Sequence, residues 1–171
     1  MRRFSAGFLS ALIAAALVLY ICVKFGLVPA RADVKPSRLE RSMARMSLDA
    51  TIAREAPQLP YPFPSSDAAI VAGSKLYLEQ CAICHGTATS GLTRLEKGLY
   101  IAPPQFAKHG VDDDPEGVTY WKVEHGIRFT AMPAYGKTLT EEQVWDVTYF
   151  LKNMPKLPPA AAAEWHKKLR G

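Results

Sequence analysis

The chain has 171 residues, of which 49% are hydrophobic and 22% are charged, and its formal net charge is +5. This length suits one compact domain with additional segments. Residues 1–63 hold nine Lys or Arg and four Asp or Glu, so they account for the whole excess, and the charges from residue 64 onward cancel. A near-neutral domain without a basic stripe is not expected to bind nucleic acid.

The first element is an uncharged, mostly apolar run from Phe4 to Val23. About 20 such residues can cross a bilayer as a helix, so we predict one transmembrane helix within an N-terminal segment of residues 1–32. The alternative is a secretory signal that is cleaved near Ala32, because "ARA" is typical of a cleavage site. Basic residues lie on both sides of the run, so they do not settle its orientation in the membrane.

Residues 33–64 are predicted to form a short helix followed by a proline-rich spacer. The sequence "SRLE", which begins at Ser37, has the pattern of a helix-capping box. Three apolar residues then recur on one helical face: Leu39, Met43 and Met46. Such a helix would lie on the domain or on lipid. Four prolines between residues 57 and 64 favour an extended spacer, after which the globular domain begins.

Residues 65–171 contain helical patterns separated by loops, and none of their segments alternates in polarity as a strand does. The three main predicted helices begin at N-caps Asp67, Asp114 and Thr140, the last within a capping box. The run Ala160–Ala163 is of low complexity. We therefore predict a small all-α domain of about three main helices, whose own apolar core is thin for its length.

The sequence "QCAICHG" places Cys81 and Cys84 three residues apart and His85 directly after them. A thioredoxin-like dithiol would require a βαβ pattern, which is missing from the sequence. A structural zinc site requires four ligands, and no second cysteine pair is present because Cys22 lies in the apolar run. A disulfide between Cys81 and Cys84 would close a strained ring. C-x-x-C-H is the attachment pattern of a c-type haem.

The haem interpretation accounts for all three residues of the motif together. On one helical turn, Cys81 and Cys84 would present their thiols to one edge of the porphyrin, and each would bond a vinyl group. His85 would supply an axial nitrogen to the iron. A covalent bond retains the group even in a small pocket, which suits a domain with a thin core. We therefore predict one haem c, bound through both cysteines.

The second axial ligand is predicted to be Met132, within "GIRFTAMPAYG" between two of the predicted helices. Its soft thioether sulfur prefers Fe(II) and raises the reduction potential. His125 and His109 remain as alternatives and would give a lower potential. Met154 at a helix end and His166 in the C-terminal tail are poorer candidates.

These motifs resemble those of class I c-type cytochromes with a single haem, especially the membrane-associated bacterial members. The resemblance covers roughly residues 67–159 and rests on "CAICHG", "APPQF", "HGIRFTAMPAYG" and "WDVTYFLKNMP". It implies a cytochrome c-like fold around a covalently bound haem. It also implies that Gly73 and Tyr77 on the first helix of the domain cross the last helix near Tyr149.

The same resemblance implies roles for residues around the haem. A proline carbonyl in "APPQF", from Pro103 or Pro104, would accept the second ring N–H of His85 and orient it. The side chains of three residues would pack beside the haem: Trp145, Tyr149 and Phe150.

The function that follows from this resemblance is one-electron transfer by an Fe(III)/Fe(II) carrier, which is not itself an enzyme and has no small-molecule substrate. Haem attachment in the family occurs outside the cytoplasm, so the domain is expected in the periplasm, at the outer face of a bacterial cytoplasmic membrane. Expected partners are a redox donor and acceptor, such as a membrane dehydrogenase, a bc1-type complex or an oxidase. The alternatives are a haem-carrying subunit of a dehydrogenase or terminal oxidase complex, and a ligand sensor in which Met132 dissociates.

Overall fold

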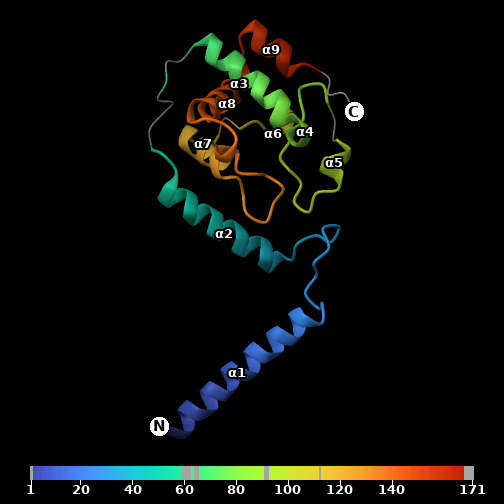
Figure 1. The fold of residues 1–171 in the computed structure, drawn as a ribbon, viewed down its shortest axis with the longest axis vertical. Coiled ribbons are helices and arrows are strands. Elements are labelled where there is room, and N and C mark those ends of the chain that lie inside the picture. Colours follow the sequence, from blue (N-terminus) through green and yellow to red (C-terminus); the bar gives the residue numbers. More distant parts are fainter. Residues whose placement is uncertain (1, 59–62, 64–65, 91–92, 112, 168–171) are drawn as a thin grey trace. The chain divides into compact units, whose positions relative to one another are not determined.

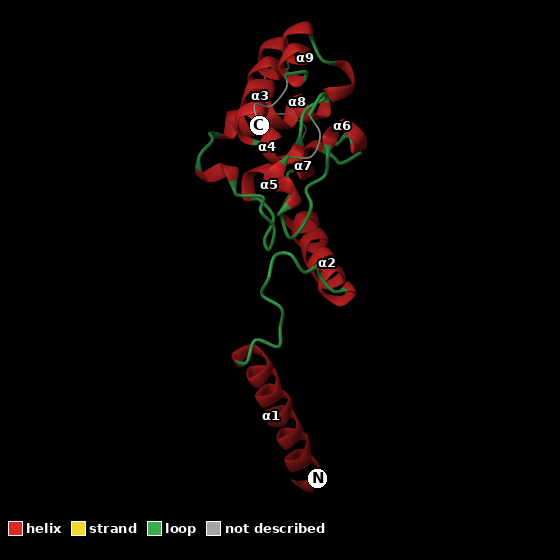
Figure 2. Cartoon of the chain, turned by 90° about the vertical axis from the view of Figure 1, so that its right-hand side faces the viewer, coloured by secondary structure: helices red, strands yellow, loops and turns green. Residues whose placement is uncertain are grey.

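The computed structural model describes residues 2–58, 63, 66–90, 93–111 and 113–167, with the side chains of residues 2–6 and 109 left aside. Within these ranges it contains helices and loops and no strand, which confirms the all-α prediction (Figures 1 and 2). The elements in chain order are α1 (Arg2–Lys24), α2 (Arg38–Glu55), α3 (Asp67–Gln80), α4 (Ala82–His85), α5 (Arg94–Lys97), α6 (Phe106–His109), α7 (Glu116–His125), η1 (Tyr135–Lys137), α8 (Glu141–Lys152), η2 (Met154–Lys156) and α9 (Pro159–Trp165). They form two compact units, Met1–Val34 and Lys35–Gly171.

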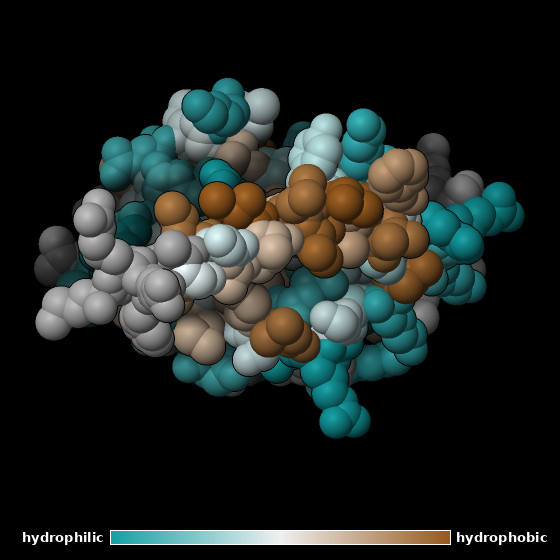
Figure 3. All heavy atoms as spheres, turned by 90° about the horizontal axis from the view of Figure 1, so that it is seen from below, coloured by the Kyte–Doolittle hydropathy of each residue, from teal (hydrophilic) through white to brown (hydrophobic). Residues whose placement is uncertain are grey.

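The first unit consists of α1 and the turn that follows it. Its large apolar side chains are exposed, for example Phe8 at 61% and Leu17 at 55%. Apolar residues gather in a band across the face shown in Figure 3. In the described part of the chain, Gly7–Lys24 is the one stretch long and apolar enough to cross a bilayer. A secretory signal shares this length and composition.

The second unit includes α2, which the sequence had assigned to the segment before the domain. Ile52 and Ala56 at the end of α2 are buried together with Trp121 of α7. The contact continues into the loop, because a Cβ on Gly117 would lie 1.7 Å from the carbonyl oxygen of Pro57. A segment with one apolar face can pack on a domain, and this packing joins α2 to it. Most of the expected proline-rich spacer lies outside the described residues.

The core of the domain is built where α3 crosses α8 (Figure 1). At this point Gly73 lacks the side chain that would separate the helices: an added Cβ would lie 2.0 Å from the carbonyl oxygen of Asp146. One turn further along α3, the Tyr77 ring packs against Phe150, with ring centroids 5.2 Å apart. Both rings are almost completely buried. The crossing thus lies beside Tyr149, where the family resemblance placed it.

Helix α9 completes this core and was not predicted from the sequence. Its Ala161 is fully buried, and its Trp165 ring lies 5.6 Å from that of Tyr77 and 6.2 Å from that of Phe150. Ala161 in the alanine run is therefore at the close-packed face of a helix that contacts α3, whereas Ala160 and Ala163 are exposed. Small side chains allow this close approach, because they keep the helix axis near the surface it covers.

Helix boundaries agree with the predicted caps in one case and differ in two. Thr140 and Gln143 form the capping box at the start of α8, which confirms the prediction. The N-cap of α3 is Ser66, whose hydroxyl accepts from the Ala69 amide, so Asp67 lies in the first turn. The N-cap of α7 is Pro115, and the Asp114 carboxylate instead binds Lys122 at 2.6 Å. The Asp114 carboxylate therefore forms an ion pair with Lys122 and does not cap α7.

Substitution of Gly73 by alanine is expected to destabilise the domain strongly. The new methyl group would meet backbone atoms of α8, which cannot rotate away, so the helices must separate. We expect the free energy of unfolding to fall by about 3 kcal/mol in urea titrations. Gly98→Ala is the matched control, since its Cβ would meet its nearest neighbour at an ordinary 3.5 Å. Equal stability of the two variants would contradict the close crossing.

Candidate haem site

The two motif cysteines and the histidine lie on one tight turn. Helix α3 ends at Gln80, and Cys81 starts the single turn of α4. The amides of Cys84 and His85 both donate to the Cys81 carbonyl, at 3.0 and 2.9 Å. Gly86 then reverses the chain in the left-handed region, with φ of 73°, where glycine is favoured. The turn therefore brings two thiols and one imidazole together, and neither cysteine is in a disulfide.

His85 is held in one orientation and one tautomer. Its Nδ1 lies 2.9 Å from the carbonyl oxygen of Pro104, and because a carbonyl can only accept, Nδ1 carries the proton. Nε2 is then the nitrogen with a free lone pair, as in a metal-binding histidine whose other nitrogen is hydrogen-bonded. Phe106 stacks on the ring, with centroids 4.4 Å apart and planes 5° apart. Burial lowers the pKa of His85, which favours the neutral imidazole.

The loop that supplies this carbonyl is tied to the turn. The Gln105 side-chain amide donates to the Cys84 carbonyl at 2.9 Å, so the residue after Pro104 reaches back to the motif. The sequence left Pro103 and Pro104 as equal candidates. In the structure, the carbonyl of Pro104 accepts the hydrogen bond from His85 Nδ1–H. The Pro103 carbonyl instead lies 3.5 Å from the side-chain amide of Gln105.

Two tyrosine hydroxyls support the turn from opposite ends. Tyr77, which is buried, donates to the Gly86 carbonyl at 2.7 Å. Tyr135 in η1 donates to the Gln80 carbonyl, also at 2.7 Å. Burial, with a contribution from the Cys81 thiol, raises the pKa of Tyr135 to about 12, so it remains a donor at neutral pH. The sequence did not single out Tyr135, although its position three residues after Met132 was an available signal.

Burial also keeps both motif thiols protonated. It raises the pKa of Cys81 to about 12, with a smaller contribution from Cys84. It raises the pKa of Cys84 as well, with Glu96 contributing further. Redox-active dithiols instead have depressed pKa values, because the thiolate is the reactive species. The environment of the turn therefore argues against a thioredoxin-like dithiol.

Met132 lies half-buried on the loop between α7 and η1 and packs against the main core. Its amide donates to the Thr130 hydroxyl at 3.1 Å, and its carbonyl accepts from the Ile127 amide at 3.3 Å. Gly126, with φ of 64°, turns the chain from α7 into this loop. The loop is thus fixed by its own hydrogen bonds, and Met132 belongs to the same apolar cluster as Cys81.

The other candidate axial ligands lie less favourably. His125 is exposed, and its ring lies 5.1 Å from Trp121, which belongs to the cluster under α2. His166 is exposed, and the side chain of His109 lies outside the described residues. Met154 packs against the main core from η2.

The aromatic residues that were expected beside the haem lie on α8. Trp145 is buried and stacks on Tyr120, with centroids 4.2 Å apart. Tyr149 is half-buried at the edge of the same core. Phe150 is fully buried between Tyr77 and Trp165, so it packs within the protein core and not at its edge.

The donor set fits a c-type haem. Two un-ionised thiols, a neutral oriented imidazole and a thioether are present, and Cys81 and Met132 pack against one apolar core. Several large apolar side chains around this core remain only partly buried, as expected where a further apolar group is accommodated: Phe106, Tyr135, Tyr149 and Leu139. Within the described residues, no group of three or more His, Cys, Asp or Glu could hold a metal ion by themselves.

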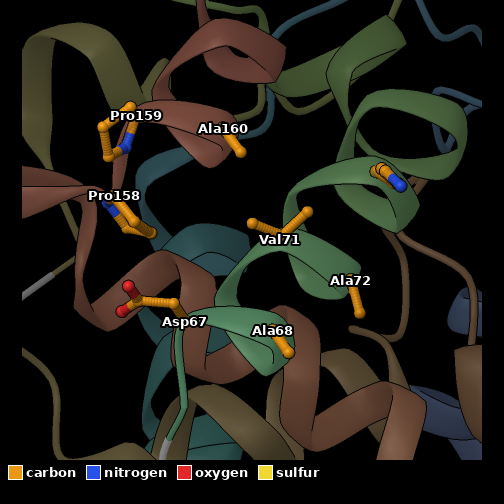
Figure 4. Close-up of a pocket in the computed structure, with 8 residues that line it drawn as sticks. Asp67, Ala68, Val71, Ala72, Pro158, Pro159 and Ala160 are labelled. Atoms are coloured by element: carbon orange, nitrogen blue, oxygen red, sulfur yellow. The ribbon is translucent and has the colours of Figure 1, made fainter.

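A surface hollow of the domain lies elsewhere. It has a volume of about 590 Å³ and lies between the start of α3 and the start of α9 (Figure 4). Asp67, Val71 and Pro159 are among its lining residues. A helix rises 1.5 Å per residue, so Cys81 is about 20 Å along the chain from Asp67. This surface hollow is therefore separate from the cysteine turn.

Residues 68–151 match the sequence model of the family described as "Cytochrome C oxidase, cbb3-type, subunit III". The domain is a c-type cytochrome. This confirms the family resemblance of the motifs, and the family implies a covalently bound haem c and a role in electron transfer. The assignment rests on the matched residues together with the C-x-x-C-H turn that they contain.

Other comparisons add little to this family assignment. A chain of the reducing HAO-like protein complex of Kuenenia stuttgartiensis is similar, with 24% sequence identity and a TM-score of 0.47. The similarity covers 57% of the cytochrome chain and 50% of the other, so this chain spans about half the length of that one. No curated protein matches the sequence.

Replacement of Tyr77 by phenylalanine is expected to destabilise the cytochrome more than the same change at Tyr135. The first change leaves the Gly86 carbonyl without its partner inside the core, whereas water can reach the carbonyl of the exposed Gln80. We expect losses of about 2 kcal/mol for Tyr77→Phe and below about 1 kcal/mol for Tyr135→Phe. Urea unfolding of both variants, followed by circular dichroism, measures the difference. The reverse order would contradict the role given to Tyr77.

Proposed function

We propose that this cytochrome is a one-electron carrier with a single haem c, bound through Cys81 and Cys84. His85 and Met132 would hold its iron. The observation that carries the proposal is the turn itself: it holds both motif cysteines and ends at an imidazole whose Nδ1–H donates to the Pro104 carbonyl. When bound, the haem supplies reversible exchange between Fe(III) and Fe(II).

Each of the site residues has a distinct role in this proposal. The Pro104 carbonyl and the Phe106 ring keep His85 in the tautomer and orientation that leave Nε2 for the iron. Met132 supplies a soft sulfur, which stabilises Fe(II) and raises the reduction potential. If His85 and Met132 both bind the iron, they would leave no open site for a substrate, and the domain would transfer electrons without chemical turnover. Trp145 and Tyr149, both on α8, would complete the apolar surroundings of the haem.

We place the domain in the periplasm, at the outer face of a bacterial cytoplasmic membrane. The apolar helix α1 supports a single-pass anchor, and a signal cleaved near Ala32 is the alternative. Partners would be redox proteins that deliver and accept the electron.

A second candidate function is a haem-carrying subunit of a larger oxidoreductase. The matching family takes its description from an oxidase subunit, which supports this candidate. The near-neutral domain also lacks the strong charge bias that steers a diffusing carrier to its partners. Purification from membranes in mild detergent separates the candidates: a subunit elutes with a large catalytic partner, and a carrier elutes alone.

Removal of the motif cysteines is expected to abolish covalent haem attachment. The double variant Cys81→Ala/Cys84→Ala has no thiol on the turn, so haem-dependent peroxidase staining after denaturing electrophoresis should disappear. Cys22→Ser is the matched control, because this cysteine lies on α1 and should leave the stain unchanged. A stained double variant would contradict attachment at this turn.

Substitution of Met132 by histidine should change the axial ligation. The oxidised protein should show the weak far-red absorption band typical of an iron–methionine sulfur bond, and Met132→His should lack it and have a lower reduction potential. Met154→Leu serves as the control, since Met154 packs on the same core and should leave the band unchanged. If the band survives in Met132→His and disappears in Met154→Leu, the ligand assignment is wrong.

A further inference from the structure

Helix α2 carries two apolar faces, and only one of them is covered. Leu48 and Ile52 pack with Ala56 against the α7 side of the domain. Three other apolar residues form an exposed stripe, in which Leu39 is 70%, Met43 61% and Met46 66% exposed. Successive residues are about 100° apart around a helix, which places this stripe roughly opposite Leu48. The packing on the domain therefore leaves the stripe in solvent.

The half of α2 that bears the stripe is also positively charged. Between residues 35 and 46 the chain has four basic side chains: Lys35, Arg38, Arg41 and Arg45. The single acidic residue in this range, Glu40, accepts a hydrogen bond from the Tyr100 hydroxyl of the domain. An apolar stripe with basic residues on the remaining surface of a helix is the pattern of helices that lie in the interface of anionic membranes.

The distance between α2 and the predicted membrane span is limited by the chain. Helix α1 ends at Lys24 and α2 begins at Arg38, so 13 residues connect them. Thirteen residues reach at most about 45 Å when fully extended. If α1 spans a bilayer, α2 must therefore remain close to a lipid surface. This step rests on the proposed anchor.

We propose that the exposed stripe of Leu39, Met43 and Met46 docks α2 onto the surface of an anionic lipid bilayer. The three side chains enter the boundary between headgroups and acyl chains, and the basic side chains of residues 35–46 add electrostatic attraction to the anionic surface. A protein partner fits less well, because three side chains present far less than the roughly 800 Å² per partner of a stable interface. Since α2 also packs on α7, docking would set which face of the haem domain is turned toward the membrane.

The test measures the water accessibility of single cysteines on α2 in the complete, haem-loaded chain. Met43→Cys and Ala44→Cys are each made in a Cys22→Ser background, where the motif cysteines are bonded to haem. Both positions are exposed in the structure and lie about 100° apart on the helix. Nanodiscs of phosphatidylcholine and phosphatidylglycerol hold one chain each, and a charged maleimide reports the reaction rate. Each rate is divided by that of the same variant unfolded in guanidinium chloride.

We expect Met43→Cys to react about tenfold more slowly than Ala44→Cys, because headgroups exclude the charged reagent from the stripe. Equal rates in discs that retain the chain would overturn the docking and leave the proposed anchor intact. Slow reaction of Met43→Cys only in discs that hold two chains would assign the stripe to a second copy, which also overturns the proposal. A chain that does not elute with the discs would refute both the anchor and the docking, while covalent haem staining tests the proposed function separately.

Discussion

The close crossing of α3 and α8 is the contact on which the rest of the domain depends. Gly73 permits it, because any side chain there would collide with the backbone at Asp146. Helix α3 continues from this point to Gln80, so the crossing also sets where Tyr77 and Cys81 lie, one and two turns further on. Tyr77 then holds Gly86 beyond the turn. The position of the C-x-x-C-H turn therefore depends on a backbone contact between α3 and α8, two helices that carry neither His85 nor Met132.

The small size of the core explains why so many elements outside the three main helices take part in the structure. Trp165 of α9 fills one side of the Tyr77 and Phe150 pair, and α2 covers Trp121 on another side of the domain. A domain of this length buries a modest share of its surface. Short helices and a covalently attached group both add apolar contacts without adding a long chain segment. The partly buried apolar residues that pack against the main core fit that arrangement.

Local signals in the sequence were sufficient for much of this description, and tertiary contacts account for the rest. The capping box at Thr140 and the C-x-x-C-H turn depend on neighbours within four residues, and both could be predicted. The packing of α2 and α9 depends on residues that are distant in the sequence. An apolar helical face predicts that the helix is covered, but it does not identify the element that covers it. The choice between Pro103 and Pro104 depends on the path of one loop. Tyr135 was overlooked because its partner, Gln80, is 55 residues away.

The motif turn and the N-terminal part of the chain differ in their charge. Around the turn, burial raises the pKa of Cys81 and lowers the pKa of His85, so both groups are uncharged before any haem is attached. The excess of basic over acidic residues, nine against four, lies in the first 63 residues, and the charges from residue 64 onward cancel. The net charge of residues 64–171 therefore gives no strong bias for steering a partner toward the domain. In this protein positive charge accompanies the apolar segments that precede the domain, which is where attraction to anionic lipid would be useful.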